Sequence, residues 1–461
     1  MVRTLGAVTV GVLVIFLVAA LILWLDYGQN KEPTVFSDDL EHFKYGSIGA
    51  EVDGYPYIIW RELPSLFPDK LPQGWQTFGF SQEAGQPLPV GLSVRQYGIE
   101  RVGFNCATCH TSTVDGGSEL ILGAPANKLD LEGYLGFLFE TAADPKFNAD
   151  NIFNSIEDRG EKLSFVDKLV YRYYVIPKIK SGFEQAKTAN EWQARRPKQG
   201  PGRTDAGNPW RVKFGMQPEN DTMVATVDYP SIWNQDIRRQ SWLHWDGNNN
   251  SLAERNLSAA LAGGATEDSL DHASIERVAE WTLVAPPPQY PYAIDEALAA
   301  QGGKIYQEQK CGSCHEPDGE FYGDVTPIAE LGTDPGRLDL FSAEMVENFE
   351  TVGAGRPWQF SHYRKSNGYA NVPLDGIWVR APYLHNGSVP TLYDLLSPPE
   401  ERPAEFKRGC DSFDKEKVGF RCSEGFTFDV AEEGNGNSGH LYGVELSMPD
   451  RLALIEYLKT K

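Results

Sequence analysis

Two copies of one short cysteine motif constrain this chain more than any other feature of its sequence. Residues 106–110 and 311–315 both read C-x-x-C-H, the attachment signature of c-type haem. In such a site the two thiols bond the porphyrin and the histidine ligates the iron. Structural zinc would need further Cys or His pairs at ligand spacing, and a thioredoxin-like pair would not account for the histidine twice. The sequence therefore predicts two covalent c-type haems, attached at Cys106, Cys109, Cys311 and Cys314, with His110 and His315 as iron ligands.

The two remaining cysteines, Cys410 and Cys422, are predicted to form a disulfide. Haem attachment uses the other four of the six cysteines, and c-type haem is attached in an oxidising compartment, where disulfides persist. The closed loop of 13 residues would stabilise the fold by about 3 kcal/mol in the chain-entropy model. Two free thiols are the alternative.

The ligands on the far faces of the haems follow less directly from the sequence. His440 ends a glycine-rich run that would let an imidazole approach a haem closely. His385 and His244 lie in other loops and remain alternative ligands. Only the second half has a histidine in a glycine-rich loop near the end of its domain. We therefore expect His315 and His440 to ligate the iron of the second haem. We expect no strong protein ligand opposite His110, with His244 as the rival for that position.

Aromatic residues surround His244 in the first half and are candidates for catalysis. Bulky indoles can wall a dry pocket for a small ligand, and a tryptophan between two haems can relay an electron. The alternative is that these tryptophans belong to the hydrophobic core. The candidate catalytic residues are Trp233, His244 and Trp245.

Charged and amide side chains suggest two accessory sites. Haem propionates need cationic partners, and arginine binds carboxylates bidentately. The oxygens of residues 246–250 would suit calcium, but a turn accounts for the same run without an ion, and we favour the turn. Candidate propionate partners in this acidic chain are Arg203, Arg211, Lys213, Arg356, Arg364 and Arg380.

An apolar segment near the N-terminus predicts a membrane anchor. Leu5–Trp24 has 20 residues and no charge, which at 1.5 Å per residue spans about 30 Å, the thickness of a bilayer core. Arg3 precedes it and Asp26 follows it, so the positive-inside rule places the bulk of the chain outside the inner membrane, in the periplasm. A cleaved signal peptide is the alternative, although its apolar core is normally shorter and ends at a small-residue site.

The charge balance limits the classes of partner. There are 42 basic and 64 acidic residues, which gives a net charge of −22. Such a surface repels phosphate backbones, which argues against nucleic-acid binding, and it suits a basic redox partner protein. Solubility alone is an equally good explanation of the charge.

Proline and helix patterns divide the chain into an anchor and two haem domains. The run Pro286–Pro291 cannot continue a helix and marks a linker. Each half contains one haem motif and ends with a similar helix-forming sequence. We predict a mainly α fold with an anchor over residues 1–25, a cytochrome c-like haem domain with long insertions over 26–290, and a cytochrome c domain over 291–461. In the last domain the C-terminal helix is expected to cross the helix before the second motif.

With these motifs in view, the sequence resembles the dihaem cytochrome c peroxidase superfamily. The resemblance rests on both haem motifs, on residues 380–392 (RAPYLHNGSVPTL) and on residues 244–248 (HWDGN), and is closest to the branch of haem-dependent rubber oxygenases. It implies two cytochrome c domains whose haems lie close enough to exchange electrons. In that branch the second haem has two histidine ligands, the far one matching His440, and the first haem has an open far face that binds oxygen. In the peroxidases a methionine is the far ligand of the second haem and a displaceable histidine that of the first.

Two functions remain open at this point. The first is a membrane-anchored periplasmic dihaem cytochrome that transfers electrons between partners. The second is a haem enzyme, a peroxidase or an oxygenase of unknown substrate, with an open first haem. The first haem discriminates between them, because two strong protein ligands favour electron transfer and an open sixth position favours catalysis.

Overall fold

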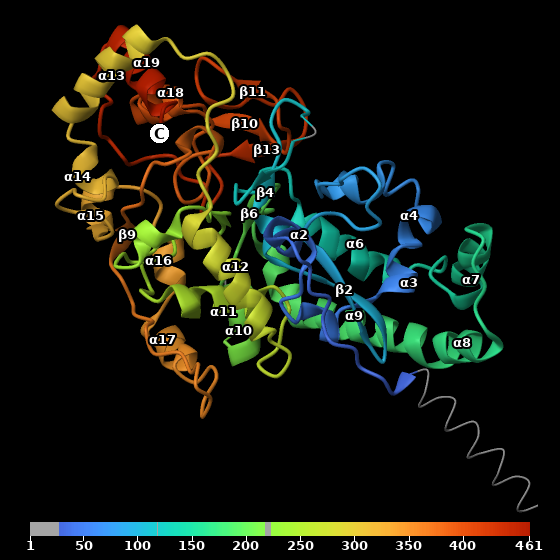
Figure 1. Ribbon diagram of the computed structural model, residues 1–461. Helices are drawn as coiled ribbons and strands as arrows, with labels where there is room; N and C mark the ends of the chain where they lie inside the picture. Colours follow the sequence, from blue (N-terminus) through green and yellow to red (C-terminus); the bar gives the residue numbers. More distant parts are fainter. Residues whose placement is uncertain (1–26, 118, 217–222) are drawn as a thin grey trace, which may run out of the picture.

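Short strands occur among the helices in both halves of the described chain (Figure 1). The computed structural model describes residues 27–117, 119–216 and 223–461. Helix accounts for 40% and strand for 11%, so the fold is mixed and the predicted mainly α class is wrong. The physical reason is that 45 glycines and 30 prolines end helices early and allow short antiparallel strand pairs to form between them.

The largest sheet leads into the first haem motif. Its β2–β3 hairpin reverses at Gly98, whose φ of 71° favours glycine. From its prolines and glycines, the sequence predicts an irregular segment over residues 26–105, so the hairpin departs from that expectation. The three antiparallel strands have the order β1-β3-β2 and are Tyr55–Pro56 (β1), Leu92–Tyr97 (β2) and Ile99–Phe104 (β3).

The first haem motif begins where this sheet ends. The side chain of Asn105 accepts a hydrogen bond from the Ala107 backbone N–H and so caps the one-turn helix Cys106–Cys109 (α5). The same amide donates hydrogen bonds to the carbonyls of Lys44 and Gly46, at 3.1 and 3.0 Å. Asn105 therefore fixes the motif against the end of the N-terminal helix Asp39–Tyr45 (α2).

Helices of the first half pack around an aromatic core. Trp60 and Trp75 stack with their ring centroids 4.3 Å apart, and the Trp60 indole donates a hydrogen bond to the Tyr134 hydroxyl at 2.9 Å. A π-helical turn, Tyr171–Val175, joins the last two helices of this group. The helices are Tyr57–Trp60 (α3), Leu63–Leu66 (α4), Leu131–Ala143 (α6), Ala149–Asp158 (α7), Phe165–Val170 (α8) and Ile176–Asn190 (α9).

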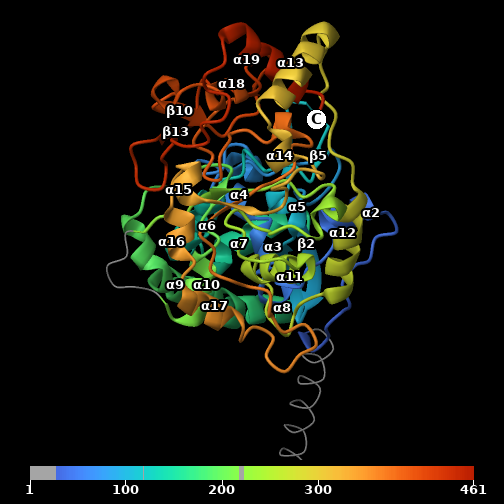
Figure 2. The same ribbon diagram turned by 90° about the vertical axis from the view of Figure 1, so that its left-hand side faces the viewer.

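The second half is built on two crossing helices, Glu296–Glu308 (α13) and Met448–Leu458 (α19) (Figure 1 and Figure 2). They approach closely at Gly302, where a Cβ atom would lie only 1.9 Å from the carbonyl oxygen of Ala453. The crossing agrees with the sequence-based expectation for the C-terminal helix. Directly after α13, the short helix Gly312–His315 (α14) carries the second haem motif.

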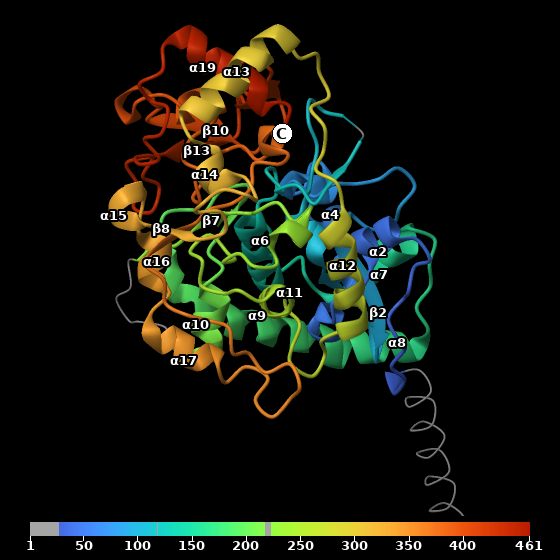
Figure 3. The ribbon, with the colours of Figure 1, turned by 60° about the vertical axis from the view of Figure 1, so that its left-hand side comes forward.

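The two halves share hydrophobic clusters. Trp210 in Asn208–Phe214 (α10) packs against Phe349 in Ala343–Phe349 (α17), with ring centroids 4.5 Å apart. Figure 3 shows these two helices side by side. Another cluster also mixes side chains from both halves. Apolar contacts therefore hold together the two regions that the sequence divides at residues 290 and 291.

The remaining elements are short and connect these units. The helices among them are Leu252–Ala262 (α11), His272–Val284 (α12), Ile328–Leu331 (α15), Gly336–Leu340 (α16) and Leu392–Leu395 (α18). The antiparallel strand pairs are Thr111–Ser112 with Ile121–Leu122 (β4, β5), Arg203–Thr204 with Val227–Asp228 (β6, β7), Val325–Pro327 with Gly368–Ala370 (β8, β9), Glu405–Arg408 with Phe426–Asp429 (β10, β13) and Phe413–Asp414 with Gly419–Phe420 (β11, β12).

No helix in the described part of the chain is long and apolar enough to cross a membrane. The longest α-helix there, α9, has 15 residues and carries lysines and a glutamate along its length. The segment Leu5–Trp24, on which the predicted anchor rests, lies outside the described residues. The predicted transmembrane helix, and the single-pass inner-membrane localisation that depends on it, are corrected accordingly: they have no support in this structure.

The helix crossing predicts opposite effects for two glycine-to-alanine changes. Gly302→Ala should destabilise the protein by roughly 1–3 kcal/mol, because the new methyl group meets the α19 backbone. Gly182→Ala in α9 is the matched control: no atom lies within 4 Å of its Cβ position, so better helix propensity should stabilise by roughly 0.5–1 kcal/mol. Urea unfolding measures both changes. Equal midpoints for the two variants would contradict the close crossing.

Candidate haem-binding site

Each motif histidine is oriented by a backbone carbonyl from a distant part of the chain. His110 Nδ1 lies 2.9 Å from the carbonyl oxygen of Pro230, and His315 Nδ1 lies 2.7 Å from that of Val372. An Nδ1–H that donates to a carbonyl leaves Nε2 with a free lone pair, the arrangement that metal-ligating histidines adopt. Both imidazoles can therefore ligate a metal ion through Nε2.

The four motif cysteines are free thiols that face a common space. Each is partly exposed, and none takes part in a disulfide. All four line one cavity of about 1530 Å³, together with both motif histidines and His440. This volume exceeds the roughly 300–1,000 Å³ of ordinary small-molecule sites. The two motifs thus open into one large shared cavity.

His440 faces His315 across this cavity. The two ring centroids lie 6.4 Å apart with an interplanar angle of 40°. A metal ion bound to one nitrogen of each ring at ~2.0–2.1 Å requires a separation of about this size. His440 Nδ1 is buried and has no hydrogen-bond partner in the described structure. These two residues fit the iron of a haem between them.

The loop that carries His440 depends on an unusual backbone. His440 has a φ of 50°, and its N–H donates a hydrogen bond to the carbonyl of Leu331 at 2.9 Å. A Cβ atom on the preceding Gly439 would lie 2.4 Å from the backbone nitrogen of Thr333. Glycine at 439 therefore lets the loop lie flat against the end of α15 and turn the imidazole toward His315.

Burial keeps the histidines of the cavity neutral. It lowers the pKa of His110 to about 4 and that of His440 to about 4, and it also lowers the pKa of His315. In the case of His440 the neighbouring His315 and Arg402 add to the effect. A neutral imidazole offers the lone pair that a metal needs.

Three arginines of the cavity wall lie beside one another. Burial is the larger cause that lowers the pKa of Arg255 and of Arg238. The charge of Arg238 lowers the pKa of Arg255 further, and the charge of Arg380 lowers that of Arg238 further. Arg255 donates hydrogen bonds to Gln235 Oε1 at 2.5 Å and to Asn256 Oδ1 at 2.8 Å, and only Arg380 has a carboxylate, Asp375, within ion-pair distance in the described structure. Buried cations without counter-ions are costly. The carboxylates of haem propionates would supply that charge.

These arginines differ from most of those that the sequence suggests. Of the suggested propionate partners, only Arg380 lines the cavity. The others are engaged elsewhere: Lys213 with Glu267, Arg356 with Asp268, Arg364 with the carbonyl of Gly247, Arg203 with Asn435, and Arg211 with Met223. Arg238 and Arg255 carry no sequence signal, because they lie far from both motifs in the chain.

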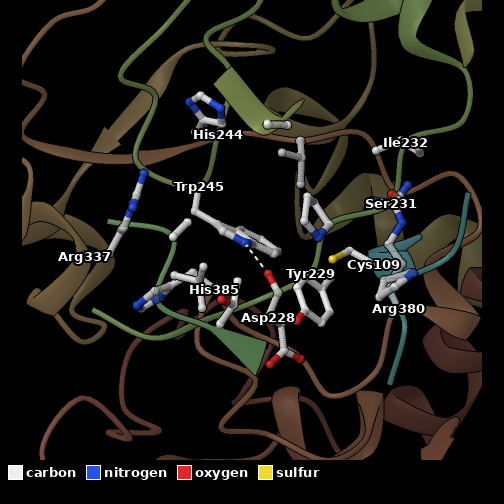
Figure 4. Close-up of a pocket in the computed structure, with 18 of the residues that line it drawn as sticks. Cys109, Asp228, Tyr229, Ser231, Ile232, His244, Trp245, Arg337, Arg380 and His385 are labelled. Atoms are coloured by element: carbon white, nitrogen blue, oxygen red, sulfur yellow. Dashed lines mark hydrogen bonds between the residues drawn. The ribbon is translucent and has the colours of Figure 1, made fainter. Parts of the chain in front are cut away.

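The three candidate catalytic residues all line the cavity. Figure 4 shows two of them, His244 and Trp245. His244 Nδ1 lies 2.6 Å from Asn248 Oδ1, so its Nε2 is the nitrogen without a bonded neighbour. The Trp245 indole donates a hydrogen bond to the Asp228 carbonyl at 2.8 Å, and the side chain lies between His244 and His385. Trp233 is only 2% exposed and donates to the carbonyl of Asp375 at 3.1 Å.

His385 is held by neighbours within the protein. Its ring stacks on Tyr369 at a centroid distance of 4.1 Å, and its Nε2 lies 3.0 Å from the Tyr369 hydroxyl. Burial lowers its pKa to about 3. The Tyr369 hydroxyl donates to the Asp334 carbonyl at 2.7 Å, so the Nε2–H of His385 donates to that hydroxyl, and the ring is held as part of the cavity wall.

The loops of His244 and His385 are two copies of one turn. The first has a backbone bridge between Leu243 and Asn249, and the second has one between Tyr383 and Val389. Positive φ values recur at equal offsets, at His244 (60°) and Gly247 (58°) and then at Leu384 (66°) and Gly387 (63°). In this alignment Trp245, and not His244, corresponds to His385. The structural repeat was not evident from the two short sequences.

Residues 246–250 form a hydrogen-bonded turn. Asn248 Nδ2 donates to Asp246 Oδ2 at 3.0 Å, and Asn249 Oδ1 accepts from the Ser251 N–H at 2.7 Å. Arg337 lies 3.3 Å from the other oxygen of Asp246. The side-chain oxygens of Asp246, Asn248 and Asn249 are thus engaged within the protein, and Asn250 is exposed. These contacts account for the run without calcium.

Cys410 and Cys422 are joined by a disulfide, with their Cα atoms 5.6 Å apart. The Cys410 carbonyl accepts a hydrogen bond from Asn127 at 2.8 Å, and the carboxylate of the next residue, Asp411, pairs with Lys128 at 2.9 Å. Asn127 and Lys128 follow the first haem motif. The disulfide-bonded segment therefore ties the C-terminal half to the first haem site.

Comparison with known proteins identifies part of this architecture. Residues 368–407, which include β9 and the His385 loop, match the model of a family described as RoxA-like, cytochrome c-like. The uncharacterized protein y4iM of Sinorhizobium fredii is 30% identical over 299 residues, which cover 54% of this chain and 68% of that protein. The uncharacterized protein y4iJ of the same organism is 26% identical over 539 residues, covering 93% of this chain and 85% of that protein.

This chain belongs to the same family as y4iM. Its second half contains a RoxA-like cytochrome c domain, so the chain is a c-type cytochrome that binds haem. The match supports the RoxA-like branch of the resemblance. The wider peroxidase superfamily stays a resemblance at the level of sequence motifs.

The disulfide should be resistant to alkylation and should stabilise the contact between the halves. Replacing both cysteines with serine should lower the free energy of unfolding by about 3 kcal/mol, the loop-closure contribution for a loop of this length. Urea unfolding of the wild type and the double variant measures the difference, and iodoacetamide labelling before and after reduction counts the thiols. Labelling of Cys410 or Cys422 in native, unreduced protein would contradict the bond.

Proposed function

We propose that this protein is a dihaem c-type cytochrome that transfers electrons, with one haem at each C-x-x-C-H motif. The observation that carries the proposal is the pairing of His315 and His440 at 6.4 Å across the shared cavity. Cys311 and Cys314 lie beside His315 and supply the thiols for covalent attachment. The first motif repeats this set with Cys106, Cys109 and His110.

The second haem would be saturated by protein ligands. When bound, haem supplies an iron that changes oxidation state by one electron. His315 is held by the Val372 carbonyl, and His440 by the hydrogen bond from its backbone N–H to Leu331. With both imidazoles as ligands, the iron would have no position for an external ligand. Fixed ligands also change little between oxidation states, which favours rapid electron exchange.

The first haem would keep its far face open, and this supports a second candidate function. Among the ring contacts of the described residues, His110 has none with a second histidine, whereas His315 has one. His244 is the rival ligand that the sequence offers for this face. Its ring is oriented by the contact with Asn248 and lies near Tyr363. An open position favours a peroxidase-like or oxygenase-like enzyme over a simple carrier.

Trp245 is placed to support either function. Its indole is fixed by the hydrogen bond to the Asp228 carbonyl, and it lines the cavity that both motifs share. A rigid indole in such a cavity can relay an electron between the two sites. Trp233, in contrast, is 2% exposed, packs in the hydrophobic cluster that mixes both halves, and acts as core.

The attachment proposal predicts a haem stoichiometry of two. Denatured wild-type protein should retain the mass of two haems, because thioether bonds survive denaturation. Cys106→Ser with Cys109→Ser should lose one haem, and Cys311→Ser with Cys314→Ser should lose the other. Intact-protein mass spectrometry reads the number directly. A wild-type protein with the mass of a single haem would contradict the proposal.

Removal of His440 should change only the second haem. His440→Ala should convert one low-spin signal to high-spin in the oxidised protein, because His315 is left as the single protein ligand. His244→Ala should leave both signals nearly unchanged. His272→Ala, at the exposed start of α12, is the control. Electron paramagnetic resonance measures all three, and a new high-spin signal in His244→Ala would instead assign His244 to the first haem.

A further inference from the structure

The negative charge of this protein is concentrated around the second haem site. Residues 311–336, which begin at the second motif, contain six acidic residues and no lysine or arginine. Residues 106–131, a segment of the same length that begins at the first motif, contain three acidic residues and one lysine. Residues 422–450, which include His440, again contain six acidic residues and no lysine or arginine. Both segments are thus strongly acidic, and basic residues border them in the chain: Lys310 and Arg337 for the first, and Arg421 and Arg451 for the second.

Exposed apolar side chains lie within the same two segments. Phe321 is 47% exposed, Leu441 is 57% exposed and Tyr442 is 45% exposed. The Phe321 N–H donates a hydrogen bond to the Ser313 carbonyl inside the motif, and the Tyr442 ring lies 5.2 Å from that of His440. Phe321 and Tyr442 line the cavity as well as being exposed, and Leu441 lies between His440 and Tyr442 in the chain.

Exposed carboxylates lie close to these apolar side chains in the chain or in space. Asp318, Glu320 and Glu330 are exposed, and Glu330 accepts a hydrogen bond from the Tyr442 hydroxyl at 3.3 Å. Lys461 pairs with Glu316 at the inner side, and Lys310 is the exposed cation that directly precedes the motif. An apolar centre with a like-charged rim is the anatomy of a protein docking surface that is steered by charge.

We propose that Phe321, Leu441 and Tyr442, with the carboxylates of Asp318, Glu320 and Glu330, form the docking surface for a basic redox protein. The proposal rests on the proposed function, since it places electron exchange at the second haem. The partner carries a lysine-rich face around its own redox group. One electron passes from the reduced partner to the second haem, so the partner is oxidised as the haem is reduced, and no covalent bond forms or breaks. The open first site stays free for a small ligand.

Charge reversal on this surface tests the proposal. The probe is a lysine-rich monohaem cytochrome c, reduced before mixing, and the second-order rate of electron exchange is measured by stopped-flow absorbance. Asp318→Lys with Glu320→Lys should slow the exchange at least ~10-fold at low ionic strength, where the Debye length is about 30 Å, and the difference should disappear near 1 M salt. Both side chains are exposed and form no ion pair with the residues that the structure describes, so the fold should tolerate both changes.

A matched control separates local from global charge. Asp158→Lys with Glu184→Lys changes the net charge by the same amount on α7 and α9, and α7 lies on the opposite side of the molecule from α14 (Figure 1 and Figure 3). This variant should exchange electrons at close to the wild-type rate. The probe with acetylated lysines should react slowly with every variant, because acetylation removes its charge. Leu441→Ser should weaken binding without changing the salt dependence.

Two outcomes would overturn the docking surface. One is an exchange rate that does not change in Asp318→Lys with Glu320→Lys, and the other is an equal loss in the control variant. Haem content and visible spectra of each variant are recorded first. Absence of haem from residues 311–315 would contradict the proposed function itself, whereas normal spectra with an unchanged exchange rate contradict only the docking surface.

Discussion

The carbonyl groups that hold His110 and His315 are the interactions on which the rest of the site depends. Pro230 lies 120 residues from His110, and Val372 lies 57 residues from His315. Each pair therefore forms only when distant segments have folded onto the motif. The carbonyl fixes which ring nitrogen faces the cavity, and that choice determines where an iron can bind. Folding and ligand orientation are coupled through these two contacts.

The two halves share a repeated turn but differ in the side chains around their C-x-x-C-H motifs. The turns at residues 243–249 and 383–389 share their bridges and their positive φ positions, yet the side chains at equivalent positions differ, as Trp245 and His385 show. In the second half a separate loop brings His440 to face His315. Nothing comparable faces His110 among the described residues. Under the proposed function, this asymmetry would give one haem with two histidine ligands and one haem with an open far face.

The chemistry was more predictable from the sequence than the architecture. Local patterns predict the haem motifs, the Cys410–Cys422 pair and the loop of His440, because each depends on a few neighbouring residues. The mainly α class was wrong, since isolated glycines and prolines create short strand pairs that have no periodicity to detect. Arg238 and Arg255 were missed because their role depends on which segments the fold brings to the cavity. Long-range contacts of this kind leave no trace in a single sequence.

The central claim is that the two haems differ in coordination, and one measurement tests it most directly. Electron paramagnetic resonance of the oxidised wild-type protein counts low-spin and high-spin haems, and carbon monoxide titration of the reduced protein counts open iron sites. The account predicts a low-spin signal from a bis-histidine haem and the binding of one carbon monoxide per chain. Two low-spin bis-histidine haems that do not bind carbon monoxide would contradict it.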